Sequence, residues 1–560
     1  MSKHNFETLV DLMKAHDSTR GWDVVVAYDE DKINALLAKQ HLPAFNSLSD
    51  FQGTSPGEYN PYTGEVEDQT YRFQSELKNN KSRLRFQSEE SSRAEIVVDV
   101  PAMTCQFLGA KDPKKTERAS RCGFLIKVKV DLLNMEGTVK EEETKGTVFI
   151  PNTTAKNSPL ITKSNYVTPV STGRGVCISF AAPIVELEAN NSDKTTPIFH
   201  AAGDRAIKNA LQEIFTSDQN NHFLSGVQSV TTNPDTIPLK PVSFAFTTVK
   251  GDEPKKLPGA LMMWISVEGG QNRGLRPSGQ TDLRFDPDPS KPAPNPIPEG
   301  SSATVILSHD LVANAFFKPN LETALSDVQI DSKVGDPGMI ISGQLKGDDV
   351  DVEIDTENVP YIVTTIDHVK FALKNPRTTV TLNPGIVNPD AITTNPPVRL
   401  QYSKTMEVGV IRTVTSPRSG LSPNVTTTVA KNSSTWAWGA TGVWKGKANS
   451  TEKSQHSNYL RLDFAQDEKW KIRTVPSDNK GDWNPFAVQH NFVPEGWSKV
   501  NPPVPKLDLK MKALDYFLTT NLLLPGKHVF NAHNPSDATK ATGLAVPRDL
   551  ILTGDVNLDA

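Results

Sequence analysis

Hydrophobic and polar residues alternate along much of this chain. In the segment CGFLIKVKVDLLNMEG (122–137) apolar residues occupy every second position, with lysines and an aspartate between them; the apolar positions are Phe124, Ile126, Val128, Val130 and Leu132. A period of two residues is typical of a β-strand with one buried face. Similar alternation occurs at 94–102, 359–373 and 398–414. Clusters of Thr, Ser, Asn, Pro and Gly separate these segments, so we predict a largely antiparallel, meander-rich sheet.

A few segments carry the longer period of an amphipathic helix instead. We predict helices over 29–40, 203–216, 309–325 and 513–524. Pro319 is expected to kink or end the third helix, and the Pro-Gly pair at 525 and 526 to stop the fourth. Their apolar stripes include Ile33, Leu36, Leu37, Phe316, Leu514, Phe517, Leu518 and Leu522, while Thr519 and Thr520 are expected to face away from the stripe of the fourth helix.

The helix predicted over 513–524 is apolar over more than half of its circumference. Such a helix needs cover on more than one side, and a strongly curved sheet wrapped around it would supply that cover. The sequence therefore favours the α+β class, with a long, highly twisted antiparallel sheet around amphipathic helices.

A proline-rich stretch, FDPDPSKPAPNPIPEG (285–300), is the clearest candidate boundary. Prolines at this spacing favour an extended, semi-rigid connector. An early helix, a long β region and a late helix occur on each side of it. We therefore predict two similarly built halves, 1–285 and 301–560, joined by a connector at 286–300; the alternative is a coincidental order of helices.

Composition narrows the class of protein. The chain is 37% hydrophobic and 22% charged, with a formal net charge of -5, which fits a folded globular protein and gives no overall field for nucleic acid. Three cysteines without metal-ligand spacing indicate neither a disulfide framework nor a zinc ribbon. The N-terminus lacks an apolar signal segment, so we expect a cytoplasmic location or release without a signal peptide.

Sequence signatures of catalysis are absent. The chain contains no GxSxG, HExxH or GxGxxG motif, and GVWKGK (442–447) departs from a phosphate-binding loop. Acidic residues alternate along 349–355, where a strand would splay them apart along a solvated face rather than converge them on calcium. We expect no enzymatic activity, no cofactor and no bound metal.

Two clusters have alternative readings. The segment KDPKKTERASR (111–121) could hold an anionic lipid headgroup or form a solvated loop; its cations are Lys111, Lys114, Lys115, Arg118 and Arg121. In TWAWGATGVWKG (435–446), Trp436 and Trp438 share a strand face and Trp444 follows a glycine-rich turn. These tryptophans fit an interfacial membrane belt or, more commonly, aromatic packing in a β core.

Three motifs resemble those of a known family. GWDVVVAYDEDKINALLAKQ (21–40), DYFLTTNLLLPGKHVF (515–530) and GLAVPRDLILTGDV (543–556) are similar to the opening and closing signatures of the P47/OrfX proteins, encoded beside botulinum neurotoxin and related insecticidal toxin clusters. The resemblance covers the two ends of the chain; the middle shares only its β character and order of elements. It departs from the family in its length and in the proline-rich connector.

The resemblance implies a tubular lipid-binding (TULIP-like) fold, in which a twisted sheet wraps long helices and leaves an apolar groove for lipid tails, without enzymatic chemistry. The apolar stripe residues named above are then candidate groove residues, or plain core. Implied partners are a lipid, such as an anionic phospholipid or phosphoinositide, with peripheral membrane contact, and a toxin-complex protein. The rival hypothesis is an interaction protein that binds a toxin or other partner and whose cavity is filled by its own side chains.

Overall fold

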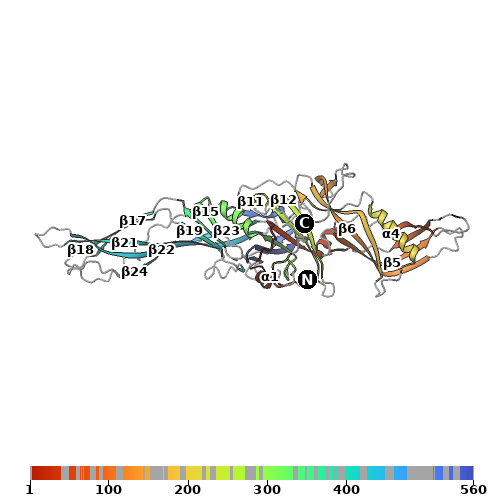
Figure 1. Ribbon diagram of the computed structural model, residues 1–560, viewed down its shortest axis with the longest axis horizontal. Helices are drawn as coiled ribbons and strands as arrows, with labels where there is room; N and C mark the ends of the chain where they lie inside the picture. Colours follow the sequence, from red (N-terminus) through yellow and green to blue (C-terminus); the bar gives the residue numbers. More distant parts are fainter. Residues whose placement is uncertain are drawn as a thin grey trace. The chain divides into compact units, whose positions relative to one another are not determined.

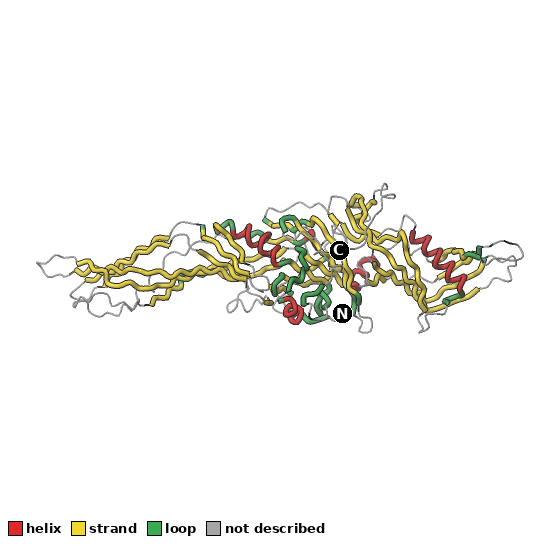
Figure 2. Tube along the Cα trace, viewed as in Figure 1, coloured by secondary structure: helices red, strands yellow, loops and turns green. Residues whose placement is uncertain are grey.

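The structure is a computed structural model of the chain. It describes residues 3–14, 16–39, 49–57, 64, 66, 68–75, 83–86, 93–108, 118–142, 146–151, 168–169, 174–189, 197–216, 222–226, 235–251, 257–270, 285–288, 290, 294–331, 339–346, 350–358, 364–373, 377–382, 385–386, 398–415, 425–447, 459–475, 509, 511–520, 529–533 and 543–558. Strands, yellow in Figure 2, make up most of these residues, as the alternation in the sequence predicted.

The chain divides into two compact units. Unit 1 comprises 1–312, 446–460 and 514–560, and unit 2 comprises 313–445 and 461–513. The division into halves around a connector at 286–300 stays a prediction. The proline-rich stretch itself is buried at Phe285 and Ile297, which are 1% and 0% exposed and belong to the core of unit 1.

Unit 1 contains an eight-stranded antiparallel sheet with the order β10-β9-β6-β5-β3-β2, in which β4 pairs with β5 and β7 with β6. Its strands are β2 (Asp50–Ser55), β3 (Gln69–Ser75), β4 (Arg83–Phe86), β5 (Arg93–Phe107), β6 (Arg118–Glu142), β7 (Gly146–Pro151), β9 (Arg174–Ala189) and β10 (His222–Gly226). Phe124, Ile126 and Val128 are buried on one face of β6, as their alternation predicted.

A second sheet of unit 1 has the order β27-β28-β14-β1-β13-β12-β8, with β26 beside β28. Its strands are β1 (Val24–Asp29), β8 (Thr168–Pro169), β12 (Pro241–Val249), β13 (Ala260–Val267), β14 (Ala303–Leu307), β26 (Phe530–Ala532), β27 (Leu544–Val546) and β28 (Leu550–Val556). Parts of the three motifs at the ends of the chain meet here, because β1 and β28 both pair with β14, and β26, which begins at Phe530, pairs with β28.

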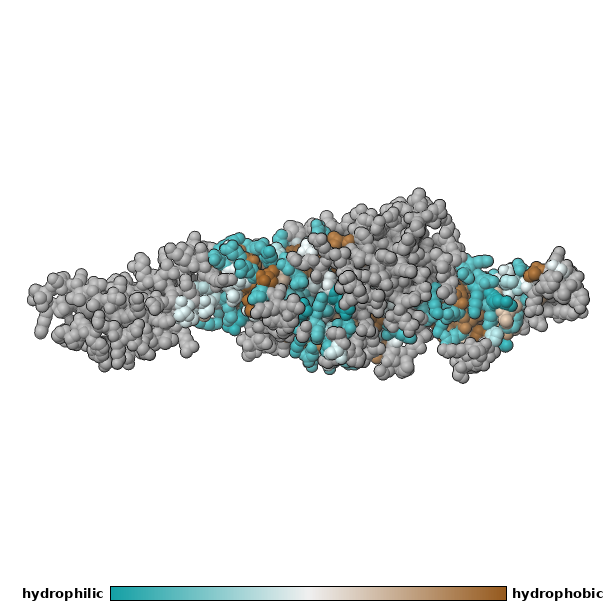
Figure 3. All heavy atoms as spheres, in the orientation of Figure 1, coloured by the Kyte–Doolittle hydropathy of each residue, from teal (hydrophilic) through white to brown (hydrophobic). Residues whose placement is uncertain are grey.

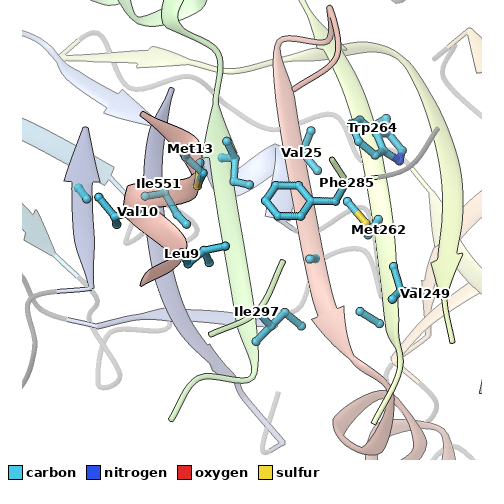
Figure 4. Close-up of a cluster of buried hydrophobic side chains, with 14 of the residues drawn as sticks. Leu9, Val10, Met13, Val25, Val249, Met262, Trp264, Phe285, Ile297 and Ile551 are labelled. Atoms are coloured by element: carbon cyan, nitrogen blue, oxygen red, sulfur yellow. The ribbon is translucent and has the colours of Figure 1, made fainter. Parts of the chain in front are cut away.

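The centre of this second sheet is buried on both faces. Every residue of β1, β13 and β14 is buried, and the valine-rich run of β1 suits this position because β-branched residues pack well in a buried strand. On one face, Val25 of β1 and Met262 and Trp264 of β13 belong to the same buried cluster as Leu9, Val10 and Met13 of the first helix, α1 (Phe6–Met13), which lies beside Ile551 of β28 (Figure 4).

Helix α1 was missed by the sequence prediction, although its signals are present. Asn5 precedes it, and the side-chain oxygen of Asn5 accepts a hydrogen bond of 2.8 Å from the backbone N–H of Thr8. This is an N-cap interaction. Phe6, Leu9, Val10 and Met13 then follow at helical spacing and are all buried, so α1 caps one face of the sheet.

The helices predicted over 29–40 and 203–216 are confirmed as α2 (Glu30–Lys39) and α4 (Ala201–Thr216). Helix α4 packs against β9 and also against β2 and β3, near the opposite edge of the eight-stranded sheet (Figure 1). Four strand spacings separate β9 from β2, about 19 Å in a flat sheet, whereas a helix is about 10 Å wide. The sheet therefore curls around α4.

Close contact between α4 and β2 depends on small residues. A Cβ atom at Gly53 would lie 2.2 Å from the carbonyl oxygen of Ala206 and 2.8 Å from the Cβ atom of Ala210. The side-chain amide of Asn209 also donates a hydrogen bond of 3.0 Å to the carbonyl oxygen of Thr54. Backbone and helix thus meet without intervening side chains at this point.

Unit 2 is built on a sheet in which strands follow the order β22-β21-β19-β16-β15, with β18 beside β21, β17 beside β18 and β24 beside β22. Its strands are β15 (Leu325–Asp331), β16 (Met339–Leu345), β17 (Val350–Asn358), β18 (Thr364–Leu373), β19 (Arg377–Leu382), β21 (Val398–Thr415), β22 (Val425–Lys447) and β24 (Lys471–Val475). The remaining described strands of the chain are β11 (Thr236–Pro238), β20 (Gly385–Ile386), β23 (Tyr459–Gln466) and β25 (Ala513–Asp515).

The helix predicted over 309–325 is shorter and not uniform. It consists of α5 (His309–Leu311), a π-helical turn η5 (Val312–Phe317) and α6 (Lys318–Leu321), and β15 begins at Leu325. Pro319 neither ends the segment nor breaks it. The wider π turn lies just before Pro319, where a missing backbone N–H would interrupt a regular α-helix.

The start of this helical segment is fixed by Asp549. One carboxylate oxygen of Asp549 accepts a hydrogen bond of 3.0 Å from the N–H of His309, and the other accepts one of 2.7 Å from the N–H of Ser18. The hydroxyl of Ser308 caps the same turn at Leu311 N. Burial raises the pKa of the Asp549 carboxyl to about 7, the nearby charge of Asp17 adds to the rise, and the two backbone N–H groups oppose it.

The helix predicted over 513–524 is wrong in its extent. Ala513–Asp515 forms strand β25, and helix α7 covers only Phe517–Thr520; residues 521–528 lie outside the described residues. Thr519 and Thr520 are buried rather than exposed. Their hydroxyls donate to the carbonyl oxygen of Tyr516 at 2.8 and 3.2 Å, which satisfies them inside the core. In the described part of the chain no helix exceeds the 16 residues of α4.

We expect Gly53→Val to lower the free energy of unfolding by about 1–3 kcal/mol, because the added side chain would overlap the backbone of α4. The measurement is urea or thermal unfolding of the full chain. Gln52→Val on the same strand is the control, since Gln52 is exposed, and it should unfold within about 0.5 kcal/mol of the wild type. Equal unfolding of both variants would contradict the close contact.

We expect the stability advantage of the wild type over Asp549→Asn to shrink as pH rises from about 5 to about 8. The raised pKa means that the folded chain keeps a proton that the unfolded chain releases near pH 4, so this group stabilises the fold less as pH rises through about 7. Unfolding midpoints across this range provide the measurement.

Asp555→Asn is the control with the opposite sign. The hydrogen bond from His533 lowers the pKa of Asp555. The stability that Asp555 contributes to the fold is therefore lost as pH falls below about 4. Parallel pH profiles for wild type and Asp549→Asn would contradict the expectation for Asp549.

Candidate functional site

One face of the unit 2 sheet is a continuous buried surface across β16, β19, β21 and β22. Its residues form cross-strand rows, because every second residue of each strand faces the same side. One row joins Met339, Leu382, Val398 and Gly442, the next joins Ile341, Val380, Leu400 and Ala440, and a third joins Gly343, Thr378, Tyr402 and Trp438. The large side chains of these rows are at most 2% exposed.

The opposite face of the same strands is more open to solvent. Ile340 and Gln344 of β16 are exposed, as are Arg399 and Gln401 of β21. The sheet therefore has one solvent-exposed face and one buried face. The buried face, made of the cross-strand rows described above, is called the dry face below. The dry face is the widest apolar sheet surface that unit 2 offers among its described residues.

The helical segment covers part of this dry face. The ring of Phe316 stacks on that of Trp444 with centroids 5.7 Å apart, and Phe317 meets Trp444 edge to face at 6.0 Å. Phe316, a predicted groove residue, is 0% exposed. It therefore packs as core in this structure, between the helical segment and β22.

Asn320 holds the same helical segment in place through hydrogen bonds to the backbone. Its side-chain oxygen accepts a hydrogen bond of 2.8 Å from the N–H of Lys512, and its amide donates to the carbonyl oxygens of Phe316 and Lys512 at 2.9 and 3.3 Å. Asn320 is buried. The buried side chain therefore pairs backbone groups of Phe316 and Lys512 that would otherwise lack a protein partner there.

The tryptophans on β22 correct the sequence interpretation of this stretch. Trp436, Trp438 and Trp444 lie on one face of a single continuous strand, with no turn between them, and all are buried. Gly442 lies on the same face and leaves room for its neighbours, because a Cβ there would lie 2.9 Å from the Cβ of Val398 and 3.1 Å from a methyl group of Leu462. They fill the dry face of the sheet, as the aromatic-core interpretation proposed.

The predicted groove residues of α2 lie in unit 1. Ile33 and Leu36 are buried at 1% and 4% exposure, and α2 contacts β1 and β4. Leu37 is within α2, but its side chain lies outside the described residues.

The groove residues predicted near the C-terminus are also mostly buried in unit 1. Leu514 of β25 and Phe517 of α7 are 0% and 2% exposed, and Leu518 is half-buried. Asp515 caps α7 by accepting a hydrogen bond of 3.0 Å from Phe517 N, and the hydroxyl of Tyr28 in β1 donates to the carbonyl oxygen of Thr520. Leu522 lies outside the described residues. The predicted set is thus divided between the two units.

Of the predicted headgroup cations, the structure describes the side chain of Arg121. Its Nε donates a hydrogen bond of 2.7 Å to the carbonyl oxygen of Ile198, in the segment that leads into α4. Lys111, Lys114 and Lys115 lie outside the described residues, and the side chain of Arg118 does too. Arg121 therefore has a structural contact, and binding of a headgroup by this cluster stays a prediction.

Side chains of the chain itself fill the concave side of the eight-stranded sheet near α4. Phe73 stacks on Phe51 at 5.1 Å, and Phe199 contacts Phe73 and Phe124 at 6.3 and 6.0 Å. These rings come from β2, β3, β6 and the approach to α4. In this region the sheet encloses aromatic core.

The described residues show little apolar area on the face in Figure 3. On the face in Figure 3, the brown hydrophobic residues of the described part form small, separate patches among teal ones. Among the residues that the structure describes, the large hydrophobic ones that are exposed are Val66, Leu108, Val242, Ile340 and Ile386. Within the described residues, no helix has the length and apolar character needed to cross a bilayer.

The comparisons with known proteins find similarity only among solved structures. No protein-family model and no curated protein matches the sequence. P47 of Clostridium botulinum E1 matches at 10% identity and a TM-score of 0.42, over 96% of this chain and 100% of that one. P47 from Clostridium botulinum A2 matches at 11% and 0.42, over 97% and 99%. A lipopolysaccharide binding protein matches at 12% and 0.25, over 96% and 99%.

The two P47 structures are the proteins that the three end motifs resemble. At this identity and these TM-scores the matches fix neither a substrate nor a partner. Function therefore has to be argued from the chain's own residues.

We expect Asn320→Leu to lower the free energy of unfolding by about 2–4 kcal/mol, because the N–H and C=O of Lys512 would lose their buried partners. Loss of the near-ultraviolet circular dichroism of the aromatic core on urea titration gives the measurement. Lys512→Ala is the matched control: its side chain is exposed and its backbone keeps both hydrogen bonds, so it should change stability by less than about 0.5 kcal/mol.

Proposed function

We propose that the protein is a non-enzymatic lipid-binding protein that holds acyl chains against the dry face of the unit 2 sheet. The observation that carries this proposal is the run of cross-strand rows, apolar over most of its width, across β16, β19, β21 and β22. Aliphatic rows of this kind, closed by a helical segment that carries Phe316 and Phe317, suit an acyl chain better than a polar ligand. The P47-like end motifs agree with it.

Hydrophobic burial is strong enough for such a role without any charged residue. Each methylene transferred from water contributes about 0.8 kcal/mol, so a chain of about 16 carbons gains roughly 13 kcal/mol before ordering costs. Displacing Phe316 or its neighbours would offset part of this gain. Binding would therefore require the helical segment to shift along the sheet.

A second candidate function is supported by the burial of the predicted residues. Ile33, Leu36, Phe316, Leu514 and Phe517 are all at most 4% exposed and pack against the chain's own side chains. A protein whose interior is filled in this way would act through its surface, by binding a partner protein such as a toxin component. The accessory role in a toxin system belongs to the same proposal.

Organic extraction of the purified full chain followed by mass spectrometry distinguishes the two functions. We expect about one lipid molecule per chain, because the burial of a long acyl chain against apolar rows is strong enough to retain it during purification. Extraction of a denatured and refolded sample is the control for surface contamination. An extract without stoichiometric lipid, and no uptake from vesicles, would favour the partner-binding function.

Liposome flotation tests the basic segment separately. We expect Lys114→Glu combined with Lys115→Glu to reduce flotation with phosphoinositide vesicles several-fold, because each cation near an anionic surface contributes about 1 kcal/mol. Vesicles of phosphatidylcholine alone are the control, on which both proteins should behave alike. Equal flotation of variant and wild type on the anionic vesicles would exclude this segment as the headgroup site.

A further inference from the structure

One end of the dry face of unit 2 carries buried hydrogen-bond donors that have no partner. Among the described residues, the hydroxyl of Tyr402 and the indole N–H of Trp470 have no hydrogen-bond partner, although these residues are only 2% and 7% exposed. Their rings meet edge to face with centroids 5.7 Å apart. A buried polar group without a partner is costly, about 1–3 kcal/mol, so natural structures rarely contain two side by side.

The position of this pair on the sheet sets it apart from the aliphatic rows. Tyr402 belongs to the row of Thr378 and Trp438, whereas the next two rows along the strands contain only apolar residues. Trp436, on the same face of β22, contacts Trp470 at 5.8 Å. Successive rows lie about 7 Å apart along the strands. Within that distance the dry face changes from an aliphatic surface to an aromatic one with donor groups.

The neighbouring tryptophan shows that the fold can satisfy such a donor when it needs to. The indole N–H of Trp438 donates a hydrogen bond of 3.2 Å to the carbonyl oxygen of Asp467. Trp438 lies on the same strand face as Trp436 and directly opposite Tyr402. The indole N–H of Trp444, on the same strand face, lacks a partner among the described residues as well, so what distinguishes Tyr402 and Trp470 is that their rings are in direct contact and carry two such donors side by side.

The chemistry of the donor pair restricts what could bind it. A phenol and an indole both donate, so the group that satisfies them must accept hydrogen bonds. Burial raises the pKa of Tyr402 to about 12, so the hydroxyl keeps its proton at neutral pH. Two cations, Lys469 and Lys471, flank Trp470 in sequence; both are exposed, and Lys471 pairs with Asp467 at 2.9 Å. Neutral donors in a dry site favour an uncharged acceptor, because a buried carboxylate or phosphate would need a counter-charge.

We propose that Tyr402 and Trp470 bind the ester carbonyl oxygen of an acyl lipid whose hydrocarbon chain lies along the aliphatic rows of the same face. This inference rests on the proposed lipid-binding function and adds the orientation and the chemical class of the ligand. The carbonyl accepts from the hydroxyl and the indole, while the chain covers the rows that begin at Leu400 and Val398. A glycerophospholipid with ester-linked chains is the occupant that joins both features.

A competition between two lipids tests this assignment without altering the protein. The full chain, stripped of lipid, is mixed with vesicles containing equal amounts of dipalmitoyl phosphatidylcholine and its dihexadecyl ether analogue, which has the same headgroup and chain length but no ester carbonyl. The protein is re-isolated and the bound lipids are counted by mass spectrometry. We expect about tenfold enrichment of the ester lipid, since one uncharged acceptor gained by two buried donors is worth about that factor.

Variants locate the enrichment at the donor pair. Tyr402→Phe combined with Trp470→Phe keeps the aromatic packing and removes both donors, so the ester lipid should lose its advantage while total lipid uptake persists. Trp438→Phe is the matched control, because the donor that it removes is already paired with Asp467, and it should keep the enrichment. Unfolding midpoints of all three proteins verify that they fold.

Each outcome has one meaning. Equal uptake of ester and ether lipid by the wild type would overturn the carbonyl assignment and leave the lipid-binding function standing. Persistent ester enrichment in the double variant would also overturn it. Failure to take up either lipid would reject the proposed function, and the present inference with it.

Discussion

The fold depends on covering sheet faces that carry too many apolar residues to meet water. In unit 1 the eight-stranded sheet curls so that strands near both of its edges touch α4. In unit 2 the rows across β16, β19, β21 and β22 are covered in part by the segment that contains Phe316 and Phe317. Burying such surface contributes about 25 cal/mol for each square ångström, so these contacts dominate the stability of both units.

Close covering leaves buried polar groups that the chain must pair. Asn320 meets the backbone of Lys512, Asp549 holds the start of α5, and Asp515 caps α7. The contact of Asn320 joins two segments that are distant in sequence, and those of Asp549 and Asp515 fix the residues at which α5 and α7 begin. Among the described residues, the hydroxyl of Tyr402 and the indole N–H of Trp470 are buried without such a partner, as are the indole N–H of Trp444 and the hydroxyls of Ser18, Ser266 and Thr304. Tyr402 and Trp470 differ from the others in lying ring to ring, and a bound acceptor there would remove an unfavourable term already present in the fold.

The local elements were largely readable from sequence. Alternation predicted β6, β5, β18 and β21, and helical spacing predicted α2 and α4 nearly to their ends. The prediction failed where tertiary packing overrides the local pattern. Residues 513–515 begin a segment whose apolar side chains have helical spacing, yet they form β25. Leu514 and Asp515 pair with Leu460 and Tyr459 of β23, and this pairing satisfies their backbone groups. Helix α1 was missed although Asn5 and the spacing of Phe6, Leu9, Val10 and Met13 indicate it.

The sequence by itself determined which residues alternate, where two of the principal helices run, and that the chain is rich in β structure, because these depend on side chains a few positions apart. Only the tertiary structure decided which strands pair and in which register. Tyr402 meets Thr378 and Trp438 through such pairings, and Trp470 joins them from a distant part of the chain. A donor left without a partner is visible only when all its neighbours are in place, and no local pattern of residues contains that information.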